Sequence, residues 1–491
     1  MTAQVRAFDI VVALEHAGLL VGVRGDLPPW ISSITADSRD VAPGALFVAV
    51  RGSALDGHDF LPRVAQQGAV ATIVLDDNAT TLPAIVVSDS RRAVAVAAAT
   101  FYGAPADRLR LVGVTGTNGK TTSASMLRHL LSTDSTPAAS IGTLGVLIGS
   151  DGAVHPGGSG LTTPGPIELQ RLLRDLVDAR VHWVTIEASS HALHQNRLDG
   201  LRFSAALFTN FTRDHLDYHG SMEAYFAAKA MLLDQLTPDG RVVINADDPA
   251  WTNLPTTSHP VTRFSAGAHV ADVYARRTEF TPAGSMFSLH AAATDPVKVQ
   301  LPLLGDFQVE NAVGVAAVGV ALGIPLTTVA SQLSTMPQVS GRLERLSTTP
   351  AVLRDYAHTP DALARALQSV RPFARGKVIV VFGAGGDRDR GKRPQMGKVA
   401  AELADVCIVT SDNPRTEDPD RILDDIVAGM PASKVLREED RRLAIALAVD
   451  LAGVDDLVLL AGKGHETYQI RGTTSYPFDE AEIVSRLTAG R

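Results

Sequence analysis

Short apolar runs alternate with helix-length segments along most of this chain. Near the start, the runs 46–50, 71–75 and 84–87 predict strands, and the alanine-rich segment 91–102 predicts a helix. The same pattern predicts further strands at 111–115, 183–187, 205–209, 241–245, 351–355, 377–382, 406–410 and 457–461. Because parallel strands need a long crossover between them, this alternation predicts an α/β fold with mainly parallel sheets covered by helices.

Two weak seams divide the pattern, one at Gly103-Ala-Pro105 and one at 336–341. A chain of 491 residues is about three times a typical domain of ~150 residues, so more than one core is expected. The sequence predicts three domains. They are a small N-terminal α/β domain over 1–107, a central domain of phosphate-loop type with a mainly parallel sheet over 108–339, and a C-terminal Rossmann-like α/β domain over 340–491.

The composition, with 45% hydrophobic and 20% charged residues, is that of an ordinary globular protein. A formal charge of −8 argues against a general nucleic-acid binder, which needs concentrated Lys and Arg. The single cysteine, Cys407, allows no internal disulfide and suggests a buried thiol in a reducing compartment. Glycines and Pro325 break the apolar run that starts at Asn311, so it predicts a buried helix and no membrane span. Since the N-terminus has no secretory pattern, we expect a cytoplasmic protein.

Polar clusters lie at the ends of six predicted strands. They occupy 116–121, 187–191, 210–215, 355–358, 412–415 and 462–466. In open parallel sheets, ligands bind beyond the carboxyl ends of the strands. The sequence therefore predicts a large site that faces two domains.

The segment Gly116-Thr-Asn-Gly-Lys-Thr121 lies between an apolar strand and a predicted helix over 122–131. Backbone N–H groups there can cradle phosphate, with Lys120 at the β- and γ-phosphates and Thr121 at a magnesium ion. The usual motif has glycine five residues before Gly119, where this chain has Val114. The alternative is a structural glycine turn with an incidental lysine.

Glu187 at a strand end is followed by Ser189, Ser190 and His191. A serine nucleophile is disfavoured because the G-x-S-x-G elbow is absent. We favour Glu187 as an oxygen ligand, direct or through water, to magnesium on a nucleotide. The alternative is that Ser189 and Ser190 cap the next helix.

Other polar residues are ambiguous by themselves. Lys229, in a mostly apolar helical segment, reads alone as a surface lysine, and His215 reads alone as a hydrogen-bonded structural histidine. The segment 383–388 approaches a dinucleotide fingerprint, but Arg388 occupies the third glycine position, so a Rossmann dehydrogenase has little support.

Taken together, these motifs form an ordered set that resembles the Mur ligases over nearly the whole chain. The shared segments are the phosphate loop, 161–164, 187–193, 209–220, 225–229, 245–248 and 341–344. Within the family, 37–39, 44–49, 386–393, 412–415 and 462–466 resemble the members that add the third amino acid of the peptidoglycan peptide. The resemblance implies an N-terminal UDP-substrate domain, a central ATP-binding domain and a C-terminal amino-acid domain.

The resemblance also implies a role for each matching residue. The ATP site would comprise Gly116, Thr117, Asn118, Gly119, Lys120, Thr121, Thr122, Asn245, Arg342, Asp355 and His358. The UDP-substrate site would comprise Ser38, Ser53, Ala54, Leu55, Thr162, Thr163, Ser190, Gln195 and Arg197. The amino-acid pocket would comprise Arg388, Asp412, Asn413, Pro414, Arg415, Gly462 and Glu466. Gln308 departs from the asparagine that is usual in the family, which puts the local nucleotide contacts in doubt.

By the same resemblance, Mg²⁺ would be held by Thr121, Glu187, His215 and Lys229, and the catalytic set would be Lys120, Lys229, His215 and Glu187. Lys229 matches the lysine that the family carbamylates, a change that turns a cation into a carboxylate able to bind magnesium. The Asp-Asn-Pro-Arg form of 412–415 is associated with meso-diaminopimelate, because Arg415 can pair bidentately with the extra carboxylate of that substrate.

The implied reaction is ATP-dependent amide formation in peptidoglycan precursor synthesis. A carboxylate of UDP-N-acetylmuramoyl-L-alanyl-D-glutamate would attack ATP, and the amine of meso-diaminopimelate would displace phosphate from the acyl phosphate. We expect a monomer with these partners and no nucleic acid. The alternatives are a lysine-adding Mur ligase, a folylpolyglutamate synthetase-like ligase, which would lack the N-terminal UDP-substrate region, and a nucleotide-operated switch.

Overall fold

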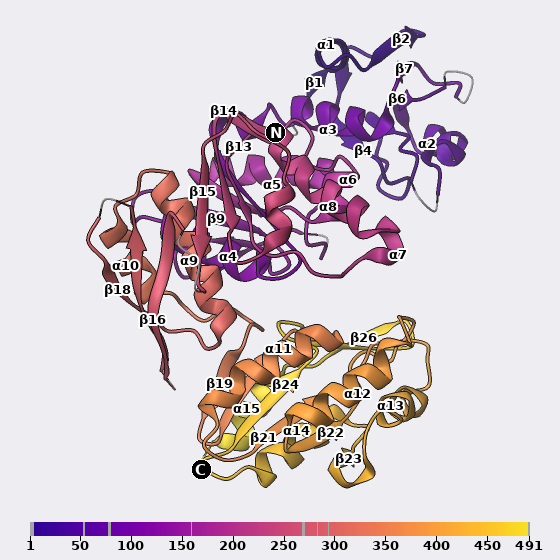
Figure 1. Ribbon diagram of the computed structural model, residues 1–491. Coiled ribbons are helices and arrows are strands. Elements are labelled where there is room, and N and C mark those ends of the chain that lie inside the picture. Colours follow the sequence, from indigo (N-terminus) through magenta and orange to yellow (C-terminus); the bar gives the residue numbers. More distant parts are fainter. Residues whose placement is uncertain are drawn as a thin grey trace. The chain divides into compact units, whose positions relative to one another are not determined.

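The computed structural model of the chain describes residues 4–52, 55–76, 80–158, 160–267, 271–281, 283–292 and 294–489. Its contacts divide into two compact units, 1–273 with 314–325 and 274–313 with 326–491. Three α/β parts follow one another along the chain, each built on its own sheet (Figure 1). The predicted fold class is therefore confirmed, and the exact domain boundaries stay a prediction.

The N-terminal part is a five-stranded sheet in the order β2-β7-β6-β5-β4, parallel except for β2. Its strands are β2 (Leu20–Arg24), β4 (Ser33–Thr35), β5 (Ala45–Val48), β6 (Ala69–Val74) and β7 (Ala84–Val87), with β1 (Val5–Arg6) paired to β3 (Trp30–Ile31). Its helices are α1 (Ala7–His16), α2 (Leu61–Gln66) and α3 (Ser90–Phe101). The three strands and the helix predicted here are confirmed, and Asp89 caps α3 by accepting hydrogen bonds from Arg91 N and Arg92 N.

The central sheet of the first unit has the order β11-β10-β9-β12-β8-β13-β14-β15, and only β10, near one edge, runs opposite to the other strands. Its strands are β8 (Arg110–Thr115), β9 (Ala138–Gly142), β10 (Gly145–Ile148), β11 (Ala153–His155), β12 (Trp183–Glu187), β13 (Phe203–Phe208), β14 (Leu236–Asn245) and β15 (Val261–Ser265). Its helices are α4 (Lys120–Leu131), α5 (Pro166–Asp178), α6 (Ser190–His194), α7 (Leu216–His219) and α8 (Met222–Ala230).

The register of this sheet determines which polar segments meet. Strand β8 lies between β12 and β13, all three parallel, with Val114 opposite Glu187 and Thr115 opposite Phe208. The carboxyl ends of the three strands therefore reach the same edge of the sheet. The glycine loop after β8, Glu187 and the segment after β13 leave the sheet side by side.

The second unit begins with β16 (Val273–Thr281) at the boundary, followed by β17 (Gly284–Ala291) and β18 (Val297–Leu301). Helix α9 (Asp306–Ala321), which crosses the unit boundary, confirms the helix predicted around Asn311, and α10 (Leu326–Ser334) packs against β18. No helix among the described residues combines the length and the apolar character needed to cross a membrane.

The C-terminal sheet has the order β19-β20-β24-β21-β22-β23, parallel from β20 to β23. Its strands are β19 (Glu344–Thr348), β20 (Ala351–Asp355), β21 (Val378–Phe382), β22 (Val406–Val409), β23 (Val435–Arg437) and β24 (Leu457–Ala461), with a separate hairpin of β25 (Tyr468–Arg471) and β26 (Thr474–Pro477). Its helices are α11 (Pro360–Val370), α12 (Lys392–Leu403), α13 (Pro419–Val427), α14 (Arg441–Leu451) and α15 (Glu480–Thr488).

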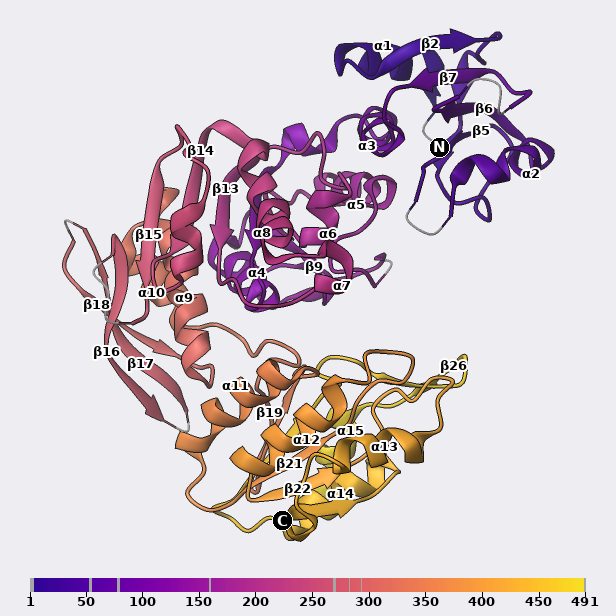
Figure 2. The same cartoon turned by 45° about the vertical axis from the view of Figure 1, so that its right-hand side comes forward.

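Helices cover both faces of this sheet, as Figure 2 shows. Val380 and Phe382 of β21 pack with α11, α12 and α13, whereas Ile379 and Val381 of the same strand pack with α14 and α15. Strands covered on both faces are apolar at every position, which explains why they appear in the sequence as continuous runs. Cys407 lies in this core with no exposed surface, as predicted.

Candidate functional site

The loop between β8 and α4 requires glycine at two positions. Gly116 has φ 146° and Gly119 has φ 82°, both in the region that favours glycine. A Cβ atom on Gly116 would lie 1.9 Å from Thr209 Oγ1. Gly119 is the N-cap of α4, so the backbone N–H groups at the start of this helix adjoin the loop. The absence of glycine at Val114, which lies buried in β8, therefore leaves the loop geometry intact.

Asn210, from the segment after β13, holds the glycine loop in shape. Its carbonyl oxygen accepts a hydrogen bond from Thr117 N at 2.7 Å, and its Oδ1 accepts one from Asn118 N at 2.8 Å. Thr209 Oγ1 adds a hydrogen bond to Asn118 O at 2.7 Å. The loop is thus braced by the neighbouring strand end, a role for Asn210 that the sequence analysis does not assign.

Two lysines converge on one carbonyl of this loop. Lys120 Nζ donates to Gly116 O at 2.9 Å and to Thr117 O at 2.8 Å, and Lys229 Nζ, from α8, donates to Gly116 O at 2.7 Å. Lys229 is only 1% exposed, so its interpretation as a surface lysine is wrong. Burial, with a contribution from the positive charge of Lys120, lowers the pKa of Lys229 well below its ordinary value.

Glu187 lies at the end of β12 with its carboxylate fixed beside the start of α4. Its Oε2 accepts hydrogen bonds from Thr121 Oγ1 at 3.1 Å and Thr143 Oγ1 at 3.2 Å, and its Oε1 accepts one from Thr143 N at 2.9 Å. A Cβ atom on Gly142 would lie 2.0 Å from Glu187 Oε1, so the carboxylate also needs glycine on β9. The structure therefore brings Lys120, Glu187 and Lys229 to one loop.

His215 lies at the N-terminus of α7, in the segment after β13, with φ 52°. Its ring centroid is 4.8 Å from that of His191. Burial is the main cause of its lowered pKa, and the positive charges of Lys120 and Lys229 act in the same direction. This environment favours the neutral imidazole, which is the form that can bind a metal.

Thr121 and Glu187 fit a magnesium ion, because a hydroxyl and a carboxylate are the oxygen donors that this ion prefers. Lys229 does not fit as an ammonium group, since a buried cation repels a metal, but its carbamate would supply oxygen donors. No group of three or more His, Cys, Asp or Glu side chains in the described part of the chain forms a ready metal site.

Several predicted UDP-substrate residues gather close to Glu187. Thr163 Oγ1 donates to Glu187 O at 2.6 Å, and Arg197 donates through Nη1 to Thr163 O at 2.8 Å and through Nη2 to Gln195 Oε1 at 2.7 Å. Thr162 Oγ1 lies 3.3 Å from Thr143 Oγ1. Arg197 thus ties the segment after α6 to the threonine pair.

The serines after β12 have separate environments. Ser189 caps α6 by accepting a hydrogen bond from Ala192 N, so the capping alternative holds for this residue. Ser190 is the first residue of the helix, and its Oγ lies 3.0 Å from His219 Nε2. In the N-terminal part, Ser38 follows β4 and is nearly buried, Leu55 is exposed, and Ser53 and Ala54 lie outside the described residues.

The residues predicted to lie near adenine and ribose come from both units, Asn245 from the first and Asp355 and His358 from the second. Asn245, buried at the end of β14 in the first unit, accepts a hydrogen bond from Asp247 N at 2.9 Å. In the second unit, Asp355 accepts one from Leu343 N at 2.9 Å, and burial raises its pKa to about 6. His358 Nδ1 lies 2.8 Å from Tyr356 O.

Arg342 and Gln308 are linked within the second unit. The Arg342 guanidinium lies over the ring of Tyr356, 4.9 Å from its centroid. Gln308 Nε2 donates to Arg342 O at 3.3 Å, and Gln308 Oε1 accepts from Asn311 Nδ2 at 3.3 Å. Gln308, which stands where the family usually has asparagine, is therefore hydrogen-bonded to the backbone of Arg342.

The predicted amino-acid loops meet at the carboxyl ends of β22 and β24. Asn413 Nδ2 donates to Glu466 Oε2 at 2.9 Å. Lys463, with no exposed surface, donates through Nζ to Asn413 Oδ1 at 3.1 Å and to Tyr468 O at 2.7 Å. A Cβ atom on Gly462 would lie 3.0 Å from Asp412 Oδ2. Lys463 thus holds the loop after β22 against the loop after β24.

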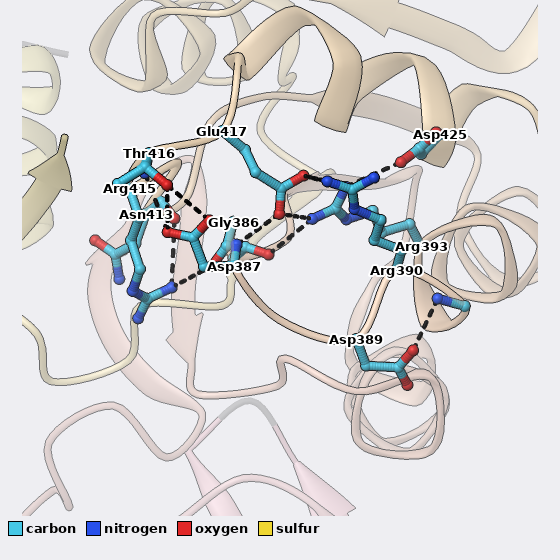
Figure 3. Close-up of polar contacts among 12 residues, drawn as sticks. Gly386, Asp387, Asp389, Arg390, Arg393, Asn413, Arg415, Thr416, Glu417 and Asp425 are labelled. Carbon is cyan, nitrogen blue, oxygen red and sulfur yellow. Dashed lines mark hydrogen bonds and ion pairs between the residues drawn. The ribbon is translucent and has the colours of Figure 1, made fainter.

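Arg415 has the left-handed backbone conformation, φ 52°. Its Nη1 donates to Gly386 O at 3.0 Å, which joins the loop after β22 to the loop after β21 (Figure 3). Arg388, in that second loop, is exposed. Pro414, between Asn413 and Arg415, is buried.

Comparison with known proteins assigns this arrangement to a family. Family models described as "Mur ligase family, catalytic domain", "Mur ligase middle domain" and "Mur ligase, glutamate ligase domain" match residues 30–110, 114–319 and 341–464. A protein of Gloeobacter violaceus named UDP-N-acetylmuramoyl-L-alanyl-D-glutamate–2,6-diaminopimelate ligase is 45% identical over 463 residues, 92% of each chain. The chain belongs to the Mur ligase family.

Two further comparisons cover nearly all of this Mur ligase. A protein of Synechococcus elongatus with the same name is 44% identical over 501 residues, 98% of this chain and 97% of that one. A solved structure titled as the same ligase has a TM-score of 0.67 and 32% identity, and the match covers 95% of this chain and 97% of that chain. The resemblance predicted from the sequence motifs is confirmed.

Several residues that shape the site of this Mur ligase are not among those predicted from the sequence. Thr143 and Asn210 fix the carboxylate and the glycine loop, and Lys463 fixes Asn413. Asn210 and Lys463 lie within the segments 209–220 and 462–466 that resemble the family, so the sequence could have indicated both residues. Thr143 lies in a turn between β9 and β10 that carries no comparable signal.

Proposed function

We propose that this Mur ligase uses ATP to join meso-diaminopimelate to UDP-N-acetylmuramoyl-L-alanyl-D-glutamate in peptidoglycan precursor synthesis. The names of its relatives support this reaction. The residue observation that carries the choice of amino acid is Arg415, held at the junction of two loops by Gly386 O. An arginine fork there can pair with a second carboxylate, which lysine lacks.

In the first step of the proposed reaction, the D-glutamyl γ-carboxylate attacks the γ-phosphorus of ATP, and the bond to the β-phosphate oxygen breaks to give ADP and an acyl phosphate. The glycine loop 116–119 and the N-terminus of α4, where Thr122 lies, would bind the phosphates through backbone N–H groups. Lys120 would exchange its bonds to Gly116 O and Thr117 O for phosphate oxygens. Its charge would then stabilise the transferring phosphoryl group.

Thr121, Glu187, His215 and a carbamylated Lys229 would hold Mg²⁺, which when bound would neutralise charge on the phosphates. Glu187 is already oriented by Thr121 and Thr143. Lys229 reaches the same loop from α8. Hydrogen bonds within the chain thus hold the carboxylate of Glu187 beside Thr121.

We expect Lys229 to form a carbamate at mildly alkaline pH. The neutral amine adds to carbon dioxide and releases a proton, and burial lowers the pKa of Lys229 so that the neutral form is available well below the ordinary lysine range. Incubation with ¹³C-bicarbonate should give one slowly exchanging carbamate signal in the NMR spectrum. The signal should disappear in Lys229→Arg and persist in Lys398→Arg, whose lysine is exposed. A signal that survives in Lys229→Arg would assign the carbamate elsewhere.

In the second step, the amine of diaminopimelate attacks the acyl carbon, a tetrahedral intermediate forms, and phosphate leaves. Arg388, Asp412, Asn413, Pro414, Arg415, Gly462 and Glu466 would bind the amino acid. Glu466 Oε2 accepts the hydrogen bond from Asn413 Nδ2 and lies 3.6 Å from Lys463 Nζ. Burial is the main cause of a raised pKa of Glu466, and a substrate ammonium beside it would favour its ionised form.

The remaining predicted residues would bind the other substrate groups. Thr162, Thr163, Ser190, Gln195 and Arg197, together with Ser38, Ser53, Ala54 and Leu55, would contact the UDP-muramyl peptide. Asn245, Asp355 and His358 would lie near adenine and ribose, and Arg342 would contact phosphate. We propose a monomer, and the single buried cysteine favours the cytoplasm.

An amine-panel assay tests this function. Purified protein with ATP, magnesium and UDP-N-acetylmuramoyl-L-alanyl-D-glutamate should form amide product with meso-diaminopimelate, and product mass should identify it. A product with L-lysine alone would favour the lysine-adding alternative. Phosphate release without either acceptor would favour a nucleotide switch. Failure to use the UDP-dipeptide, with a folate accepted instead, would favour the folylpolyglutamate alternative, which the match of residues 30–110 disfavours.

A further inference from the structure

Two loops of the C-terminal part are joined around Arg415. One follows β21 and contains Gly386 and Asp387, and the other follows β22 and contains Arg415 and Thr416. Gly386 N donates to Asn413 O at 2.9 Å, and a Cβ atom on Gly386 would lie 1.8 Å from Pro414 O. The two backbones therefore touch directly where the arginine begins.

Asp387 closes this junction from the exposed side. Its carboxylate accepts a hydrogen bond from Thr416 N at 3.1 Å and a shared one from Thr416 Oγ1, which lies 2.9 and 3.0 Å from its two oxygens (Figure 3). Both side chains belong to exposed residues. Thr416 follows Arg415 directly, so a bond to its backbone N–H constrains the peptide that gives Arg415 its left-handed conformation.

Glu417 anchors the same junction from the buried side. Arg393 of α12, 1% exposed at its side chain, donates to both Glu417 oxygens, at 2.9 and 3.1 Å, and to Asp425 Oδ2 at 2.9 Å. Glu417 Oε1 also accepts from Asp387 N at 2.6 Å. The hydrogen bonds from Arg393 are the main cause of a lowered Glu417 pKa of about 2, so this carboxylate is ionised at neutral pH.

The Arg415 guanidinium is hydrogen-bonded to the same loop that contains Asp387. Its Nη1 donates to Gly386 O, one residue before Asp387, whereas its backbone N donates to Ile470 O and its carbonyl oxygen accepts from Gly472 N. The segment of Gly386 and Asp387 therefore holds the tip of Arg415 and the residue that follows it. We propose that Asp387 is a positioning residue that, through Thr416, fixes Arg415 for the second carboxylate of the amino-acid substrate. The inference rests on the proposed function, because it assigns Arg415 to that carboxylate.

Kinetics with the full-length protein test the proposal. Asp387→Asn keeps a residue that tolerates the left-handed conformation of this position, φ 54°, but weakens its acceptor, and Thr416→Val removes the hydroxyl donor. Each variant should raise KM for meso-diaminopimelate about 3- to 10-fold, with kcat and KM for ATP close to wild type. Thr416→Ser, which keeps the hydroxyl, should restore the wild-type KM.

Asp389→Asn is the matched control. Asp389 is an exposed aspartate of the same loop that accepts a hydrogen bond from Gly391 N within that loop, so its replacement should leave KM for the amino acid unchanged. In an Arg415→Ala background, Asp387→Asn should cause no further rise in KM, because the group it positions is gone. Equal effects of Asp387→Asn with and without Arg415 would overturn the proposal.

The kinetics distinguish a wrong role for Asp387 from a wrong amino-acid substrate. A wild-type protein that ligates meso-diaminopimelate, with an unchanged KM in both Asp387→Asn and Thr416→Val, would contradict only the role of Asp387. A wild-type protein that never accepts this amino acid would contradict the proposed function and the positioning role together. Thermal melting of each variant should show no loss of stability beyond that of Asp389→Asn, since both residues are exposed.

Discussion

Replacement of Lys120 with alanine is expected to lower kcat for amide formation by about 10³-fold, an effect typical of removing a group that stabilises transition-state charge. Lys120 is the first residue of α4, and its Nζ already lies beside the glycine loop, where it donates to Gly116 O. Without it, the charge that develops on the transferring phosphoryl group would lose a fixed partner. The UDP-dipeptide should still bind, because its proposed contacts come from other residues.

This separation of binding from turnover can be measured directly. Initial rates of phosphate release give kcat, and titration calorimetry with the UDP-dipeptide gives its Kd. Lys398→Ala, at an exposed position of α12, is the matched control and should leave both quantities unchanged. Normal turnover in Lys120→Ala would refute the assigned role, and loss of UDP-dipeptide binding would indicate a wider structural effect.

Replacement of Arg415 with alanine is expected to reduce kcat/KM for meso-diaminopimelate by about 10²- to 10⁴-fold, because the second carboxylate of the substrate would lose a charged, bidentate partner. The wild-type enzyme should discriminate against L-lysine, whose side chain ends in an amine without a second carboxylate. In Arg415→Ala that preference should largely vanish. The change should come mainly from a lower kcat/KM for meso-diaminopimelate, because L-lysine has no second carboxylate to pair with Arg415.

The comparison needs both amino acids with each protein. Arg486→Ala, on the exposed side of α15, is a suitable control for the loss of one arginine and should leave the ratio of the two kcat/KM values unchanged. Arg415→Lys keeps the charge but not the bidentate fork, and should recover little of the preference. Equal use of the two amino acids by the wild-type protein would discredit the assignment of Arg415.

Strands that carry the site could be predicted well from the sequence. Trp183–Glu187, Ala351–Asp355 and Leu457–Ala461 are found at the predicted positions, because parallel strands covered on both faces are mainly apolar. The strands β16, β17 and β18 were not predicted. Polar residues such as Arg276, Arg277 and Lys298 interrupt their pattern, so these strands lack a continuous apolar signal.

Side-chain environment could be predicted less well. The sequence around Lys229 is that of an ordinary helix, and its burial depends on Tyr225 of the same helix and on Gly116, which is 113 residues away. Contacts of this range follow from the sheet order, which no local pattern encodes. The same limit applies to Gly386 and Arg415, since nothing near either residue in the sequence indicates that they bond to each other.

The direct contact of Gly386 with Pro414 bears on attempts to redesign which amino acid this enzyme accepts. If only the segment 412–415 were replaced by that of a relative with a different preference, a different turn would have to pack against the backbone at Gly386. The contact there leaves no space for even one additional carbon atom. The segments 385–393 and 412–417 therefore have to be exchanged together as one cassette. A library that varies one of them alone should yield mostly inactive chimeras.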